Sequence, residues 1–200
     1  MGRPPANALA TATPERLLEA ALAEFGAVGF AEAKLADIAA HAGITRPSLL
    51  YHFRTKEELY EATVQRSFER LAVALAEAMT GPAPFVERFR AMLRRYVDFV
   101  ASEPAVARIV LRELLEGTGP GALILVEQVA PLVDTVERFV RTQGKGDVRP
   151  SVPVRAAIMQ IAGDVMLRAA AGPLREPLWG KADHAQTLAE HLLLEEGAHR

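Results

Sequence analysis

The densest group of side chains suited to a specific contact lies in residues 34–53, KLADIAAHAGITRPSLLYHF. On a helical wheel with Leu49 and Phe53 turned inward, the outward side carries a proline, a hydroxyl, an apolar residue and an aromatic ring: Pro47, Ser48, Leu50 and Tyr51. Arg46 and His52 fall at the margins of that side. Hydroxyl groups hydrogen-bond to base edges and apolar groups contact thymine methyls, so this pattern favours readout of the major groove of DNA.

The charge around this segment differs from that of the whole chain. Residues 34–56 hold four basic residues against one acidic residue, a local net charge of +3, while the chain as a whole carries −2. The basic residues are Lys34, Arg46, Arg54 and Lys56. A small basic patch on an acidic body attracts phosphate locally, as a site-specific DNA-binding protein requires.

Two short predicted helices position these side chains. The first buries Leu35, Ile38 and Ala39, and Gly43 permits the positive φ of a tight turn. The second begins after Thr45, whose hydroxyl caps the exposed N–H groups. Two short helices joined by a glycine-containing turn form a helix-turn-helix. The alternative, a packing corner in an ordinary helical bundle, gives an outward tyrosine and proline no role.

Proline and glycine divide the chain into helices, and the sequence shows no strand with alternating polarity. We expect an all-α protein of about nine helices, with a three-helix N-terminal part and a larger C-terminal helical part. The first helix is predicted to begin at Thr13-Pro14 and to end at Gly26 and Gly29. A kink is expected at Pro131 and a loop at residues 172–180. The later predicted helices are 55–79, 84–99, 104–117, 121–143, 154–171 and 183–196.

The C-terminal part has charged residues inside apolar stretches. Glu127 lies in ALILVEQVAPLV and Asp164 in IAGDVMLRAA. Tyr96 and Met159 come from helices that are mostly core. We predict that these four residues line a pocket for a small, largely apolar ligand among the helices of residues 56–170.

Two of the later helices predict a dimer interface. Helix 154–171 carries more small apolar surface than one subunit readily buries: Ala156, Ala157, Ile158, Ile161, Ala162, Val165 and Ala169. The last helix adds Leu188, Leu192 and Leu193 at helical spacing. We expect these faces to form a four-helix interface with their symmetry mates.

The sequence gives little support for catalysis, for metal binding or for cofactor binding. The chain has no cysteine, no GxSxG sequence and no P-loop, and the glycines of 117–121 lack the spacing of a nucleotide-binding loop. His184 and His191 share a helical face but have no nearby third ligand. We therefore expect no enzyme activity, no metal and no cofactor. The sequence has no apolar run of about 18–20 residues and no signal-peptide pattern in the first dozen residues, so we expect a cytoplasmic protein.

Residues 13–60 resemble the tetracycline-repressor (TetR) family. The resemblance rests on fixed spacings: Ala20-Ala21, Phe25, Gly29-Phe30, Ile38-Ala39, Ala42-Gly43, Leu49-x-Tyr51-His52-Phe53 and Lys56-Glu57-x-Leu59. It implies a homodimeric repressor with a DNA-binding domain at 11–71, whose helix-turn-helix is 34–53, and an effector-binding and dimerisation domain at 72–200. The alternative is a constitutive DNA-binding protein without an effector.

The resemblance also implies roles for single residues. Those matching Pro47, Ser48, Leu50, Tyr51 and His52 touch DNA, and the lysine matching Lys56 binds phosphate at a helix N-terminus. Ala33 stands where threonine is usual, so that one phosphate contact is either missing or transferred to Lys34. Leu50 replaces a common tyrosine and reduces polar contact with bases there.

Overall fold

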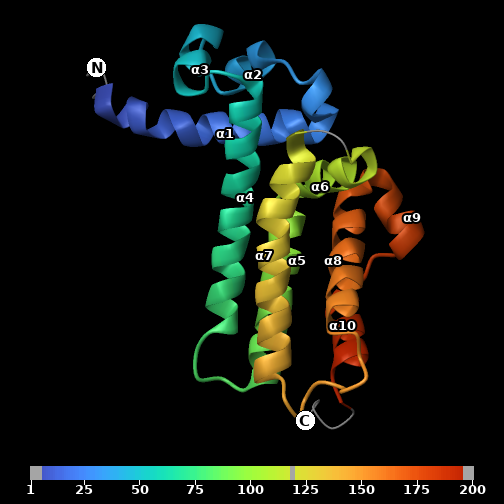
Figure 1. Ribbon diagram of the computed structural model, residues 1–200. Coiled ribbons are helices and arrows are strands. Elements are labelled where there is room, and N and C mark those ends of the chain that lie inside the picture. The colour runs from blue at the N-terminus through green and yellow to red at the C-terminus, as the bar shows by residue number, and fades with distance from the viewer. Residues whose placement is uncertain (1–5, 118–119, 196–200) are drawn as a thin grey trace.

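The computed structural model describes residues 6–117 and 120–195, and in these ranges it is built of helices (Figure 1). They comprise ten α-helices and one short 3₁₀ helix. An all-α protein was predicted, and this is confirmed.

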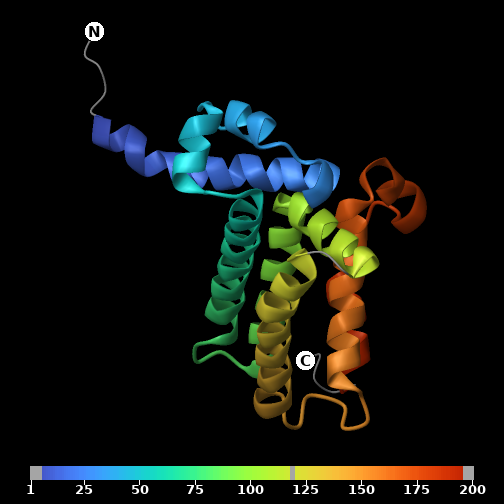
Figure 2. The same ribbon diagram turned by 45° about the horizontal axis from the view of Figure 1, so that its top comes forward.

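One end of the molecule is formed by the first three helices. They are α1 (Ala6–Glu32), α2 (Leu35–His41) and α3 (Arg46–His52). Figures 1 and 2 show α1 lying crosswise, with α2 and α3 on the side away from the body. The helix α1 begins upstream of the predicted start and contains Pro14. It is interrupted at Gly29 (φ 83°), a conformation that a side chain would strain, as the sequence predicted for its end.

The body is a bundle of longer helices. They are α4 (Lys56–Met79), α5 (Phe85–Ser102), α6 (Pro104–Glu116), α7 (Pro120–Gln143), α8 (Val154–Ala170) and α10 (Ala185–Leu193). The helix α4 runs from the N-terminal end down the length of the body, and α6 crosses beside α1 (Figure 1). The structure describes no helix long and apolar enough to span a bilayer.

Two proline-containing segments were predicted to depart from a regular helix. The helix α7 nevertheless continues uninterrupted through Pro131, and the Thr135 hydroxyl donates to the Pro131 carbonyl (2.8 Å). Residues 172–180, predicted as a loop, hold the 3₁₀ helix η1 (Gly172–Leu174) and the short helix α9 (Arg175–Trp179). Pro173 stands at the start of η1 and Pro177 in the first turn of α9, where the backbone N–H groups have no partner within the helix.

The larger of two hydrophobic clusters joins the two ends of the protein. It contains Leu17 of α1, Leu49 of α3, Leu71 of α4 and Leu193 of α10. The predicted domain boundary at 71–72 falls inside α4, where Leu71 is buried. The division into domains 11–71 and 72–200 stays a prediction.

Candidate DNA interface and internal cavity

The helix-turn-helix is held together by a small buried core. Ile38, Ala39 and Leu49 are buried, while Leu35 and Phe53 are half-buried. The turn between α2 and α3 has its positive φ at Gly43 (69°), and Thr45 caps α3 by accepting a hydrogen bond from the Ser48 N–H (3.3 Å). These local features follow the sequence-based prediction.

The outward face of α3 centres on Tyr51, which is 86% exposed. Its ring contacts the His52 ring edge to face (5.5 Å between centroids). The flanking residues Arg46 and Pro47 are also exposed, and Ser48 is half-buried. An exposed aromatic side chain with no packing partner in the core is available for contact with a ligand surface.

Leu50 lies differently from the prediction. It is half-buried and packs against the hydrophobic core, so it belongs to the edge of the outward face. Lys34 is exposed at the start of α2.

Lys56 has partners inside the chain. Its ammonium donates to the carbonyl oxygens of Ala31 (3.0 Å) and Ala33 (3.2 Å) and lies over the Phe30 ring (4.6 Å). These contacts tie the start of α4 to the end of α1. An ammonium has three donors, so one N–H is left for a phosphate.

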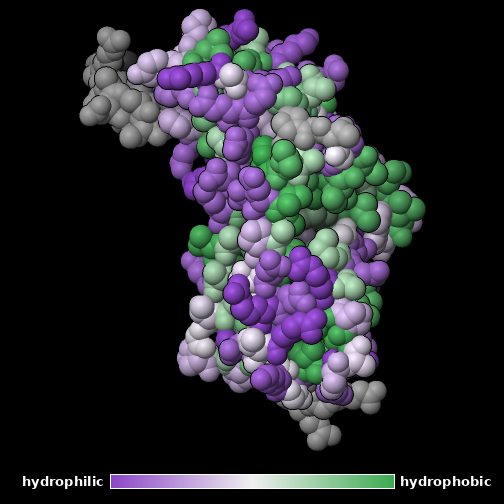
Figure 3. Space-filling model, viewed as in Figure 1, coloured by the Kyte–Doolittle hydropathy of each residue, from purple (hydrophilic) through white to green (hydrophobic). Residues whose placement is uncertain are grey.

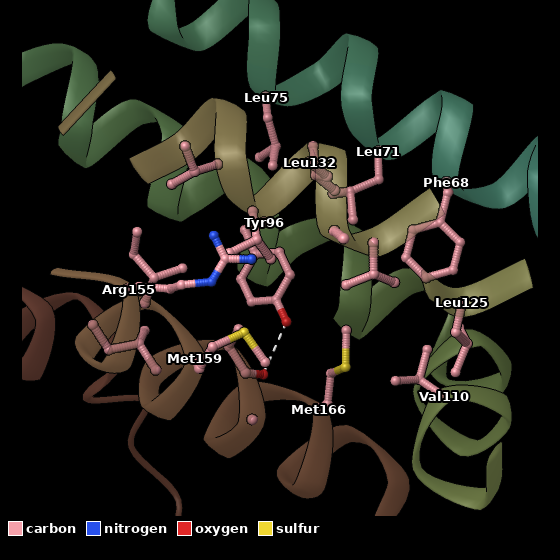
Figure 4. Close-up of a pocket in the computed structure, with 18 of the residues that line it drawn as sticks. Phe68, Leu71, Leu75, Tyr96, Val110, Leu125, Leu132, Arg155, Met159 and Met166 are labelled. Carbon is pink, nitrogen blue, oxygen red and sulfur yellow. Dashed lines mark hydrogen bonds between the residues drawn. The ribbon is translucent and has the colours of Figure 1, made fainter. Parts of the chain in front are cut away.

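A cavity of about 550 Å³ lies inside the body, lined by residues of α4, α5, α6, α7 and α8 (Figure 4). Its wall is almost wholly apolar; Phe68, Leu71 and Leu75 enter from α4, Leu132 from α7 and Met166 from α8. The size falls in the range of small-molecule sites.

Two of the four predicted pocket residues line this cavity. The Tyr96 hydroxyl donates to the Ala162 carbonyl (2.9 Å), the dashed line of Figure 4, and burial raises the pKa of Tyr96. Met159 enters the cavity from α8. The other two predictions are corrected: Glu127 is exposed outside the lining, and Asp164 accepts a hydrogen bond from the Trp179 Nε1–H (2.8 Å) outside it.

The cavity has polar groups that the sequence analysis missed. Glu113 of α6 is buried in the lining, and its Oε1 accepts a hydrogen bond from the Tyr60 hydroxyl (2.6 Å). Arg155 of α8 also lines the cavity and pairs with Asp134 (2.6 Å) and Glu137 (3.1 Å) of α7. The spacing of Glu113 from buried residues in α6 was the available signal.

The surface near the cavity is apolar. Val126 and Met159 line the cavity and are 65% and 46% exposed, so it can be reached between α7 and α8. The space-filling view shows hydrophobic residues gathered over α6 and the start of α7, and more hydrophilic ones over the N-terminal end (Figure 3). Arg141 and then Arg155 lower the pKa of Glu137 through hydrogen bonds.

The predicted dimer faces are partly covered within the chain. Ala157, Ile161, Val165 and Leu193 are buried by their own subunit, so those assignments are corrected. Ile158, Ala162 and Ala169 are half-buried. The exposed apolar residues of α8 and α10 are Ala156, Met159, Leu167, Leu188 and Leu192.

Comparisons with known proteins agree with this architecture. Residues 17–63 match the family described as bacterial regulatory proteins, tetR family. The chain is 32% identical over 95 residues to the HTH-type transcriptional activator FasR of Mycolicibacterium smegmatis, covering 48% of this chain and 43% of FasR. It is 29% identical over 107 residues to the HTH-type transcriptional regulator RutR of Escherichia coli, covering 54% of this chain and 50% of RutR. These alignments span about half the length of each relative.

Solved structures share the fold over most of the chain. The fatty acid degradation regulator FadR of Bacillus halodurans has a TM-score of 0.73 at 17% identity, covering 89% of this chain and 96% of FadR. A TetR-like regulator from Rhodococcus sp. RHA1 has a TM-score of 0.67 at 24% identity, covering 89% and 91%. This chain thus combines an N-terminal helix-turn-helix with a helical C-terminal part. Its residues 17–63 match the TetR family of bacterial regulatory proteins, and the whole chain shares the fold of TetR-like regulators.

Proposed function

We propose that this protein is a homodimeric regulator that binds a specific DNA operator and is released from it by a small apolar ligand. The observation that carries the proposal is the pairing of an exposed recognition face on α3 with an apolar cavity walled by α4, the helix that begins directly after it. Catalysis has no part in this proposal.

The proposed DNA contacts fall into two groups. The outward side of α3, with Pro47, Ser48 and Tyr51 at its centre and Leu50 at its edge, faces the major groove and reads bases. The remaining proposed contacts reach phosphates or the margins of the groove: Lys34, Thr45, Arg46, His52 and Lys56. Phosphate contacts orient the protein, while base contacts give it specificity.

A dimer is proposed because one α3, with seven residues, covers too few base pairs for a genomic address. Two symmetric copies read two half-sites one or more helical turns apart. We place the interface on the exposed apolar residues of α8 and α10, among them Leu167 and Leu188. Such an interface is self-complementary, as a two-fold axis requires.

The ligand acts on DNA binding through α4. This helix has 24 residues and so spans about 36 Å, from the contacts of Lys56 with α1 to the far end of the cavity. A ligand that binds better to the DNA-free arrangement lowers operator affinity, and each tenfold loss needs about 1.4 kcal/mol of that preference. Regulators of fatty acid degradation and of ketosteroids are among the structural neighbours, which supports an apolar ligand.

Repression is proposed from the family resemblance, although FasR is named an activator. A reporter gene placed behind the selected operator decides the direction. Expression that rises when this protein is deleted supports repression, and expression that falls supports activation.

The decisive experiment is selection of bound duplexes from a random pool with the purified full chain. We expect one enriched, two-fold symmetric sequence. Tyr51→Ala should weaken binding to it by about 1–3 kcal/mol and relax the sequence preference. Unchanged affinity of Tyr51→Ala would show that α3 does not read DNA with this face.

The competing hypothesis is a constitutive DNA-binding protein without an effector. A thermal-shift screen separates the two, because a ligand that binds only the folded state raises the melting temperature. Stabilisation by a small molecule supports the sensor, and stabilisation by DNA alone supports the constitutive protein.

A further inference from the structure

Glu113 is a carboxylate buried in an apolar wall. Glu113 is 5% exposed, and it lines the cavity together with other residues of α6 and α7. One carboxylate oxygen, Oε1, accepts the Tyr60 hydroxyl, but Oε2 is buried and has no hydrogen-bond partner among the residues that the structure describes.

An unpaired buried carboxylate oxygen is costly. A buried polar group without a partner loses its hydration and gains no hydrogen bond in return, and the cost is greater for a charged group. Such groups are rare in native structures and call for an explanation. A ligand that donates a hydrogen bond to Oε2 removes this cost when it binds.

The other polar side chains of the described lining are already engaged. The Tyr96 hydroxyl donates to the Ala162 carbonyl, and Arg155 is paired with Asp134 and Glu137 across α7 and α8. Arg155 thus has two carboxylate partners to give up before it could bind an anion. Among the described side chains that line the cavity, Glu113 is the one with a carboxylate oxygen still able to accept a hydrogen bond.

The backbone leaves room for this carboxylate. Gly121 stands against Glu113, and a Cβ at position 121 would overlap the Glu113 carboxyl group. Glycine at 121 therefore lets the carboxyl group lie between α6 and the start of α7, beside the cavity.

We propose that Glu113 anchors the ligand of this cavity, and that the ligand is a mainly apolar molecule whose head group donates a hydrogen bond, an alcohol or a protonated amine. The inference rests on the proposed function, since it assigns chemistry to the ligand of the same cavity. A carboxylate head group offers no donor at neutral pH and is repelled by Glu113. The apolar walls from α4 and α8 hold the body of the molecule.

The same carboxylate connects the cavity to the DNA-binding end. The Tyr60 ring contacts Phe25 (4.9 Å) and Phe30 (5.1 Å) of α1 edge to face. A donor on Oε2 shares the carboxylate with Tyr60, so binding of the head group changes the hydrogen bond that joins α6 to α4 beside α1.

The test compares three probes of equal chain length: decylamine, 1-decanol and decanoate. Each is titrated into the full-length protein by calorimetry at pH 7, below its critical micelle concentration. We expect the amine and the alcohol to bind about tenfold or more tightly than decanoate, which is the effect of a hydrogen bond to a charged group.

Two variants test the residue. Glu113→Gln keeps an oxygen for the Tyr60 hydroxyl and turns an N–H₂ donor toward the cavity, so the preference for amine over carboxylate should shrink to about onefold or invert. Glu127→Gln removes an exposed carboxylate outside the cavity and should leave the preference unchanged. This control separates anchoring from attraction by the overall negative charge.

Each result decides the proposal. Equal binding of the three probes, no binding of any, or an equal response of the two variants overturns the assignment to Glu113. Selection of duplexes from a random pool with the same protein preparation tests the proposed function separately. If a duplex is selected but the preference among the probes is absent, the assignment of Glu113 as the anchor is wrong, while the proposed function as a DNA-binding regulator is still supported.

Discussion

Replacing Tyr60 by phenylalanine should lower the free energy of unfolding more than the same replacement at Tyr96. Tyr60 is 2% exposed, and its hydroxyl donates to the buried Glu113 carboxylate at 2.6 Å. Hydrogen bonds to charged groups contribute about 1.5–3 kcal/mol, and Tyr60→Phe leaves both oxygens of a buried carboxylate without a partner. We expect a loss of unfolding free energy at the upper end of that range.

Tyr96→Phe is the matched control, because the same atom is removed from a hydrogen bond to a neutral carbonyl. Loss of the Tyr96–Ala162 hydrogen bond should cost about 0.5–1.5 kcal/mol. Both variants are compared by urea unfolding at one protein concentration, since the stability of a dimer depends on concentration. The slope of free energy against urea should not change.

A double variant sharpens the comparison. Tyr60→Phe combined with Glu113→Leu replaces both partners with apolar side chains, which costs less than leaving one of them unpaired. The double variant should therefore be more stable than Tyr60→Phe alone. If Tyr60→Phe costs no more than Tyr96→Phe, or the double variant is the less stable, Glu113 is not held as a buried carboxylate by Tyr60.

Four further outcomes are expected. Burial and the Glu113 carboxylate raise the pKa of Tyr60, so the unfolded chain loses this proton at a lower pH than the folded protein. The free energy of unfolding should therefore fall as the pH rises above about 10. A pH series of urea melts should show a smaller fall for Tyr60→Phe. Gly29→Ala should lower stability by about 1–3 kcal/mol in the same melts, because its φ is positive and a Cβ would meet a guanidinium of α6. Lys56→Met should weaken binding to all DNA sequences and also lower the melting temperature, because the Lys56 ammonium donates hydrogen bonds to two carbonyl oxygens at the end of α1. Loss of DNA binding without a change in melting temperature would contradict this. Leu167→Glu should give monomers in sedimentation analysis, while Leu115→Glu, 88% exposed on α6, should not.

The N-terminal end was predictable because its structure depends on short-range rules. A threonine cap begins α3 and another begins α4, where Thr55 accepts from the Glu58 N–H (3.0 Å). Glycine at position 43 takes the positive φ of the turn. The exposed position of Tyr51 follows from helical geometry once Leu49 is buried.

The cavity was only partly predictable because long-range packing decides which residues line it. Glu127 stands out in the sequence for its apolar neighbours, yet it faces outward from α7. Glu113 stands between Arg112 and Leu114 in the sequence, and its spacing from Val106, Ile109 and Val110, all buried, indicates that it lies inside. Local composition is a weaker signal than position on the buried face.

Leu50 and the apolar residues of α8 show the same limit. A wheel places Leu50 outward, but the edge of the short helix α3 also rests on the core. In α8 the sequence shows an excess of apolar residues without showing which helices of the same chain cover them. Ala157, Ile161 and Val165 are covered by the chain itself, which leaves a different set for a partner.

The continuity of the core through α4 has a consequence for how the protein unfolds. A fragment ending at residue 71 would cut α4 where Leu71 packs, and it would expose apolar side chains that α5 and α6 cover in the intact chain. The two functional parts therefore lack independent cooperativity, and calorimetric melting should give one transition rather than two. A molecule bound in the cavity would then protect the helix-turn-helix from proteolysis without touching it, since the protein must open as a whole.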